Sequence, residues 1–204
     1  AIPADLVSVD PALGASVLTT LRDQLAARRA ALAPPAKLRV LVSADPDVPY
    51  GVVAPAVLAA RAADVEIHYG LGGAAPAVAP DVAPSKAWDR PRSPTTITDS
   101  RPFVMTLAVG AGGAIDFEAT KPLPYGFSGK PGARVDALSG PRLDLDRVAV
   151  ALETIKRIYA DETTVTIVAQ YATPWKLVFP LTAAVRAAAD GAPYFPNVRL
   201  GPAR

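Results

Sequence analysis

The stretch VLVSADPDVPYGVVAPAVLAARAA, residues 40–63, returns in altered form 125 positions later, at residues 165–188. The two stretches align without a gap, and nine of the 24 positions are identical. Four of these nine are alanine, which is abundant in this chain, so chance explains part of the match. The two prolines six residues apart and the arginine six residues further on are harder to explain by chance. A repeat of this length is a supersecondary unit, so we predict that the chain holds two copies of one small fold.

Around the first stretch, apolar spacing predicts the order helix, strand, helix, strand. A β-rich run at residues 38–43, a helix with apolar residues on one face at 53–60, and an alternating half-buried strand at 65–69 follow one another. Residues 2–9 are a candidate for a further strand in front. The first helix is predicted from leucines at helical spacing, interrupted only by Arg28: Leu18, Leu21, Leu25 and Leu32.

The second copy has a fuller pattern. Two strand-like runs, at residues 103–109 and 114–118, flank the glycine-rich residues 110–113 and predict a hairpin, with a turn-rich loop from 120 to 141. A strand at 165–169, a helix with Thr173 as its N-cap and Gly191 at its end, and a strand at 197–200 complete the unit. Its first helix is predicted from a stripe of apolar residues: Leu145, Val148, Leu152, Ile155 and Tyr159.

The complete unit is therefore β-β-α-β-α-β, which predicts an α+β fold of two tandem two-layer units. Each strand–helix–strand step favours parallel pairing, and the leading hairpin makes the sheet mixed, with both helices on one face. We predict a first unit at residues 1–72, with part of the leading hairpin absent as one option, and a second unit at 102–204. Residues 73–101, rich in Ala and Pro, are the predicted linker.

Composition excludes several classes of protein. The net charge is +2 and neither sign forms a long run, so we expect no nucleic-acid partner. The chain has no cysteine and a single histidine, which excludes thiolate chemistry and metal sites built from several imidazoles. No run of 18 apolar residues is present, so we expect no membrane span in this chain. We also expect no cofactor and no bound metal. The chain begins at Ala1, for which we expect either a processed mature protein or an excised soluble domain.

No constellation of nucleophile, base and orienting group occurs, so we expect no catalytic residues and no enzyme activity. Asp45 and Asp47 follow a predicted strand, and we expect them to cap the next helix rather than to bind a cation or a sugar hydroxyl. Tyr50 and Trp175 share one position at the start of that helix. An aromatic side chain there either stacks on a sugar or peptide or packs under the preceding loop, and packing is the more ordinary role.

Two further pairs of residues match between the copies. Arg61 and Arg186 lie near helix ends, where they complement the helix dipole or contact anionic groups. Pro55 and Pro180 lie six residues into the predicted helix, which indicates either a kink or a later helix start. His68 is predicted to be a solvent-facing strand residue. The candidate binding residues are Asp45, Tyr50, Arg61, Gln170, Trp175 and Arg186.

The run VLVSADPDVPYGVV at residues 40–53, followed by AARAA at 59–63, resembles the periplasmic domain of the ExbD/TolR family. The hairpin at 105–118 is similar to the strands before the first helix in that family, and the resemblance covers some two-thirds of the chain. The second copy departs from the pattern, with Gln170 in place of Asp45, Trp175 in place of Tyr50 and Lys176 in place of Gly51.

The resemblance implies a non-enzymatic protein of the periplasm or cell envelope. Members of this family act in biopolymer transport with membrane motor subunits of the ExbB/TolQ type, driven by proton flow, and some contact peptidoglycan. Their soluble domains tend to dimerise, so a tandem copy implies a covalent pseudo-dimer, or else a homodimer. The alternative hypothesis is a small-molecule sensing or regulatory module with its ligand between the two domains.

Overall fold

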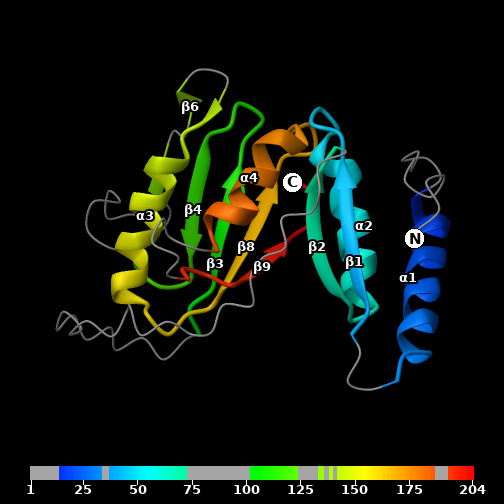
Figure 1. Cartoon of the computed structure of the whole chain (residues 1–204). Helices are drawn as coiled ribbons and strands as arrows, with labels where there is room; N and C mark the ends of the chain where they lie inside the picture. Colours follow the sequence, from blue (N-terminus) through cyan, green and yellow to red (C-terminus); the bar gives the residue numbers. More distant parts are fainter. Residues whose placement is uncertain are drawn as a thin grey trace.

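The computed structural model describes residues 14–33, 37–72, 102–123, 133–135, 138–139, 142–186 and 193–204. Its elements, drawn in Figure 1, are α1 (Gly14–Ala30), β1 (Arg39–Ala44), α2 (Tyr50–Ala62), β2 (Glu66–Leu71), β3 (Met105–Val109), β4 (Ile115–Ala119), β5 (Ala133–Val135), β6 (Leu138–Ser139), β7 (Arg142–Leu143), α3 (Leu145–Ile158), β8 (Thr164–Ala169), α4 (Trp175–Ala184) and β9 (Asn197–Leu200). We call the described residues from 14 to 72 the N-terminal half and those from 102 to 204 the C-terminal half.

In the N-terminal half, β1 and β2 form a parallel pair joined by α2, with Val40 opposite Ile67 and Val42 opposite Tyr69. These four side chains point to the face that α2 covers, because alternate residues of a strand share a face. The helix α1 contacts the edge of this layer through Leu25, which packs with Val40 and the end of α2. Within the described residues, this sheet has only two strands.

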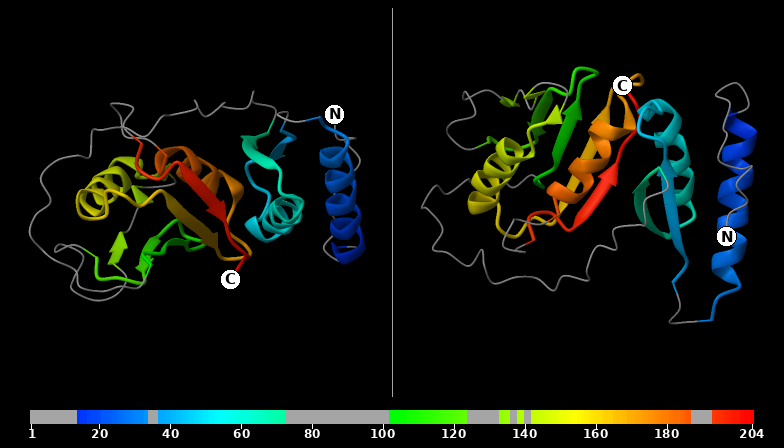
Figure 2. Two further views of the ribbon diagram at one scale, coloured as in Figure 1. Left: turned by 90° about the horizontal axis from the view of Figure 1, so that it is seen from below. Right: turned by 45° about the horizontal axis from the view of Figure 1, so that its top comes forward.

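The C-terminal half contains a five-stranded mixed sheet with the order β5-β4-β3-β8-β9. The hairpin β3–β4 is antiparallel, whereas β8 is parallel to both β3 and β9. Gly113 allows the hairpin turn, since its φ of 81° lies in the left-handed region that other residues rarely adopt. The helices α3 and α4 lie side by side on one face of this sheet (Figures 1 and 2).

The main hydrophobic core crosses from one half to the other. Tyr50, Val53, Val57 and Tyr69 of the N-terminal half belong to the same buried cluster as the inward residues of β3, β4, α3, β8 and α4. Figure 2 shows the N-terminal half beside the edge of the larger sheet that ends in β9, where α2 contacts β9 and α4 contacts β2. The two halves therefore share their main core, while a smaller cluster of Leu25, Val40, Ala60 and Ala63 lies within the N-terminal half alone.

The α+β class, the mixed sheet and the parallel strand–helix–strand steps are confirmed. The hairpin and the strand at 197–200 also form as predicted. Descent of the halves from one copied unit, and the domain boundaries, stay predictions. The candidate strand at 2–9, the linker at 73–101 and Gly191 lie outside the described residues.

Two predictions of helix geometry were wrong in detail, and one of two alternatives for the helix prolines is excluded. The helix α1 ends at Ala30, and Leu32 lies beyond it with 38% of its surface exposed. The helix α4 ends at Ala184, short of the predicted glycine stop. Since α2 and α4 begin at Tyr50 and Trp175, Pro55 and Pro180 lie inside the helices, so a later helix start is excluded.

A charged residue is buried at the end of α3. Lys156 is only 3% exposed, its Nζ donates a hydrogen bond to the carbonyl of Glu162, and it lies 5.0 Å from the centre of the Phe195 ring. Burial lowers the pKa of Lys156 to about 8, against the opposing influence of the nearby carboxylates of Glu162 and Asp161. Folding therefore favours the neutral amine.

We predict that this lysine gives a distinct pH dependence of stability. Between pH 7.5 and 9.5 the unfolded chain keeps the Lys156 proton that the folded chain loses, so the free energy of unfolding should rise with pH, with a slope approaching about 1.4 kcal/mol per unit. Lys156→Met should remove this rise, whereas Lys37→Met, at an exposed position, should retain it. Urea denaturation across this pH range checks the prediction, and equal slopes for the wild type and Lys156→Met would contradict it.

Candidate functional site

The N-termini of α2 and α4 meet where the two halves touch. Pro49 and Pro174, which are 125 positions apart, form an isolated antiparallel β-bridge. Their backbone angles are nearly the same, with φ −61° and ψ 140° at Pro49 and φ −62° and ψ 141° at Pro174. Each is the N-cap of its helix, and neither helix has a side-chain capping hydrogen bond. The first N–H groups of both helices must therefore find other partners.

Each half supplies the missing partners of the other. The N–H of Tyr50 donates to the carbonyl of Thr173 over 2.7 Å, and the N–H of Trp175 donates to the carbonyl of Val48 over 2.8 Å. One residue further along, Gly51 N–H donates to Tyr171 O over 2.9 Å, and Lys176 N–H donates to Pro46 O over 2.8 Å. In both pairs, one bond maps onto the other by the offset of 125. We call this arrangement the reciprocal cap.

The aromatic side chains at this position lie beneath the reciprocal cap. Tyr50 and Trp175 are both 0% exposed. The Tyr50 hydroxyl lies 2.6 Å from the carbonyl oxygen of Gly201 and 3.2 Å from that of Ile167, and burial raises its pKa. The indole N–H of Trp175 donates to Gly70 O over 2.8 Å. Packing, the more ordinary of the two predicted roles, is what these positions show; the binding role stays a prediction.

The predicted arginines approach one residue that the sequence did not single out, Tyr69. Burial raises the pKa of Tyr69, against the opposing charges of Arg61 and Arg186. Arg61 also donates to the carbonyl of Leu200 over 2.7 Å, so it ties α2 to β9. The Arg186 guanidinium lies 5.9 Å from the Tyr69 ring centre, and burial lowers its pKa. Its buried Nε has no hydrogen-bond partner among the described residues.

The three polar candidates at the strand ends are exposed at the surface. The expectation that Asp45 and Asp47 cap α2 was wrong, because a proline is the N-cap and carbonyl oxygens of the other half accept the free N–H groups. Asp47 instead forms an ion pair with Lys176 at 2.5 Å, and Asp45 is exposed. Gln170 is also exposed, and its side-chain oxygen accepts from Ala111 N–H over 3.1 Å, which fastens the β3–β4 turn.

Two other expectations need correction. Thr173 does not cap α4 with its side chain; it is fully buried, and its carbonyl accepts the bond from Tyr50. The His68 ring is half-buried rather than fully solvent-facing, and it lies 2.9 Å from the Glu66 carboxylate.

The cluster provides packing and hydrogen bonding rather than acid–base chemistry. Tyr50 and Trp175 each direct their polar atoms at backbone carbonyls, and Tyr69 packs edge-on against Trp175, with ring centres 6.3 Å apart. The sequence signal that could have identified Tyr69 is its position at the inward end of the alternating strand, opposite Val42.

The described part of the chain contains no group of three or more His, Cys, Asp or Glu residues placed to hold a metal ion. Over the same residues, no helix is both long enough and apolar enough to cross a membrane. Comparison of the chain with protein-family models, with curated proteins and with solved structures finds no match.

We predict that the Tyr50 hydroxyl stabilises the contact between the halves. Tyr50→Phe keeps the ring but removes the donor to the buried carbonyl of Gly201, whereas Ile167 O keeps its bond from Gly201 N–H, so the substitution should lower the free energy of unfolding by about 1–3 kcal/mol. Tyr171→Phe is the matched control, because its side chain is 48% exposed, and its effect should stay within about 0.5 kcal/mol. Equal effects of the two substitutions in urea denaturation would contradict the prediction.

Proposed function

We propose that this chain is a non-enzymatic cell-envelope protein that works in the manner of the ExbD/TolR soluble domains. In this role it binds a membrane motor subunit of the ExbB/TolQ type or peptidoglycan, within a system linked to the proton-motive force. The observation that carries the proposal is the reciprocal cap. It packs two α/β layers through corresponding positions, which is the paired arrangement that the family resemblance implies.

The place of the resembling residues supports the same proposal. The run at 40–53 supplies β1, the following turn and the start of α2, so it builds one side of the contact between the halves. A dimer of single-domain chains would need two such runs, and this chain carries a second, altered one at 165–178. In the proposal, this single chain therefore takes the place of a dimer, with its two halves covalently joined.

The proposal assigns partner binding to the face of β1–β2 that α1 and α2 leave uncovered. Arg39, Leu41 and Glu66 lie on this face, since they alternate with the inward residues Val40 and Ile67. Leu41 is 40% exposed and sits beside charged neighbours, which suits a contact with a polar polymer or a protein surface.

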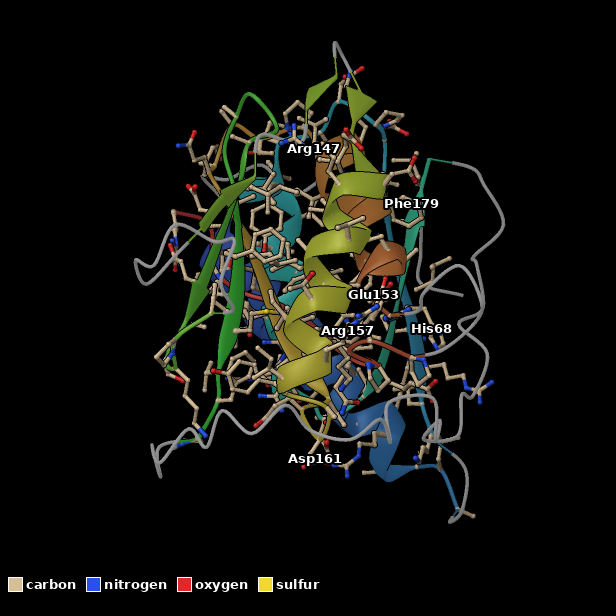
Figure 3. All side chains as sticks on the ribbon, turned by 90° about the vertical axis from the view of Figure 1, so that its left-hand side faces the viewer. His68, Arg147, Glu153, Arg157, Asp161 and Phe179 are labelled. Carbon is tan, nitrogen blue, oxygen red and sulfur yellow. The ribbon has the colours of Figure 1, made fainter. Side chains whose placement is uncertain are left out.

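Co-sedimentation with purified sacculi and pull-down with a motor subunit test the role. We expect at least one of the two to be retained, and Leu41→Ser to weaken that binding about tenfold, the scale of one buried aliphatic side chain. Val150→Ser is the matched control, because Val150 is 66% exposed on α3, along which Figure 3 labels Arg147, Glu153 and Arg157.

Retention of neither sacculi nor motor subunit would overturn the proposal. A metabolite that raises the melting temperature by several degrees would instead favour a sensing module, through binding linkage.

A further inference from the structure

The backbone contacts between the halves do not by themselves select a partner. The four N–H donors and carbonyl acceptors of the reciprocal cap lie at corresponding positions, and main-chain groups are the same in every residue. Trp175 donates to Gly70 O, and the Tyr50 hydroxyl lies within hydrogen-bonding distance of Gly201 O. On the backbone alone, either half could therefore cap a second copy of itself. Any choice between like and unlike halves must come from side chains.

We propose that the Gly51/Tyr171 and Asp47/Lys176 contacts restrict the N-terminal half to one partner, the C-terminal half of this chain or of a second copy. Pairing of like halves is then disfavoured. This inference concerns assembly and does not rest on the envelope role.

The first contact is steric. A Cβ atom added to Gly51 would overlap the ring of Tyr171, so this ring lies directly against a helix position that has no side chain. The counterpart of Gly51 in the C-terminal half is Lys176. If two C-terminal halves met in the same way, the lysine side chain would enter the volume that the Tyr171 ring occupies.

The second contact is electrostatic. Lys176 Nζ lies 2.5 Å from Asp47 Oδ1. The counterpart of Asp47 in the C-terminal half is Ala172, and the counterpart of Lys176 in the N-terminal half is Gly51. A pair of C-terminal halves would thus offer two lysines and no carboxylate, and a pair of N-terminal halves would offer two carboxylates and no lysine. Both side chains are exposed, so this pair lies at the border of the contact, where two like charges without a counter-ion disfavour the pairing of like halves.

The two contacts act in the same direction. A pair of one N-terminal and one C-terminal half places the Tyr171 ring against Gly51 and the Lys176 ammonium beside the Asp47 carboxylate. A pair of N-terminal halves loses both, because Pro46 stands at the position that corresponds to Tyr171. A pair of C-terminal halves adds the clash with Lys176 to the missing carboxylate.

Cleavage of the folded full chain tests the selectivity directly. A protease site placed within residues 78–84 separates the halves covalently after folding, and native mass spectrometry then identifies the complexes. We expect every complex that is detected, at any concentration, to contain one N-terminal and one C-terminal half. Complexes of two like halves, or dissociation into single halves at micromolar concentration, would overturn the proposal.

Intact-chain variants test the steric contact. Gly→Ala inside a helix ordinarily stabilises it, but Gly51→Ala should lower the melting temperature by about 3–8 °C, because the methyl group displaces the Tyr171 ring. Adding Tyr171→Ala should reverse at least half of that loss. Gly112→Ala is the matched control, since a Cβ there meets nothing within 4 Å. A Gly51→Ala loss that Tyr171→Ala leaves unchanged would overturn the steric part.

Charge exchange tests the electrostatic contact. Asp47→Lys and Lys176→Asp should each lower the melting temperature by about 1–4 °C by placing like charges together. The two substitutions combined should return it to within about 1 °C of the wild type. Additive losses in the double variant would overturn the electrostatic part.

Discussion

The reciprocal cap is the constraint on which the arrangement of the molecule depends. An α-helix begins with N–H groups that have no partner inside the helix, and these are costly when they are buried without a partner. Here both helix starts have a proline N-cap, which provides no side-chain acceptor, and both obtain their acceptors from the other half. Separation of the halves would leave these N–H groups without their protein acceptors at the start of both helices. The shared core adds apolar burial beneath the same contact.

The contact also accounts for the aromatic residues at the first positions of α2 and α4. Tyr50 and Trp175 differ in size and polar group, yet each directs its polar atom at the carbonyl of a glycine at the end of the other half's last strand. A Cβ added at Gly201 would press against Val168, and one added at Gly70 would press against Ser43. The side chains thus differ between the halves while the acceptor stays the same. Such variation is compatible with a contact whose geometry is set by the main chain.

Local patterns in the sequence predicted the elements well, because each element depends on neighbours a few residues away. The alternation of apolar and polar residues predicted β2, and the glycine-rich turn predicted the β3–β4 hairpin. The caps could not be predicted in this way. Asp45, Asp47 and Thr173 are residue types that favour capping, but the acceptors in the structure are main-chain carbonyls of a segment about 125 residues away. Every residue has such a carbonyl, so the sequence does not indicate which one accepts the bond. Tyr69 was missed for the same reason, since its neighbours Trp175 and Arg186 come from the other half.

The two-stranded sheet of the N-terminal half has a consequence for biosynthesis. An isolated strand pair of this size is marginal in water and needs a further layer to persist. The ribosome releases this half first, and the residues that complete its core follow only after roughly 100 more are added, on the order of 5–20 s later at ordinary elongation speeds. During that interval Val53, Val57 and Tyr69 have no apolar cover from the later half. A nascent chain of this kind would depend on chaperones that shield such surfaces until translation ends.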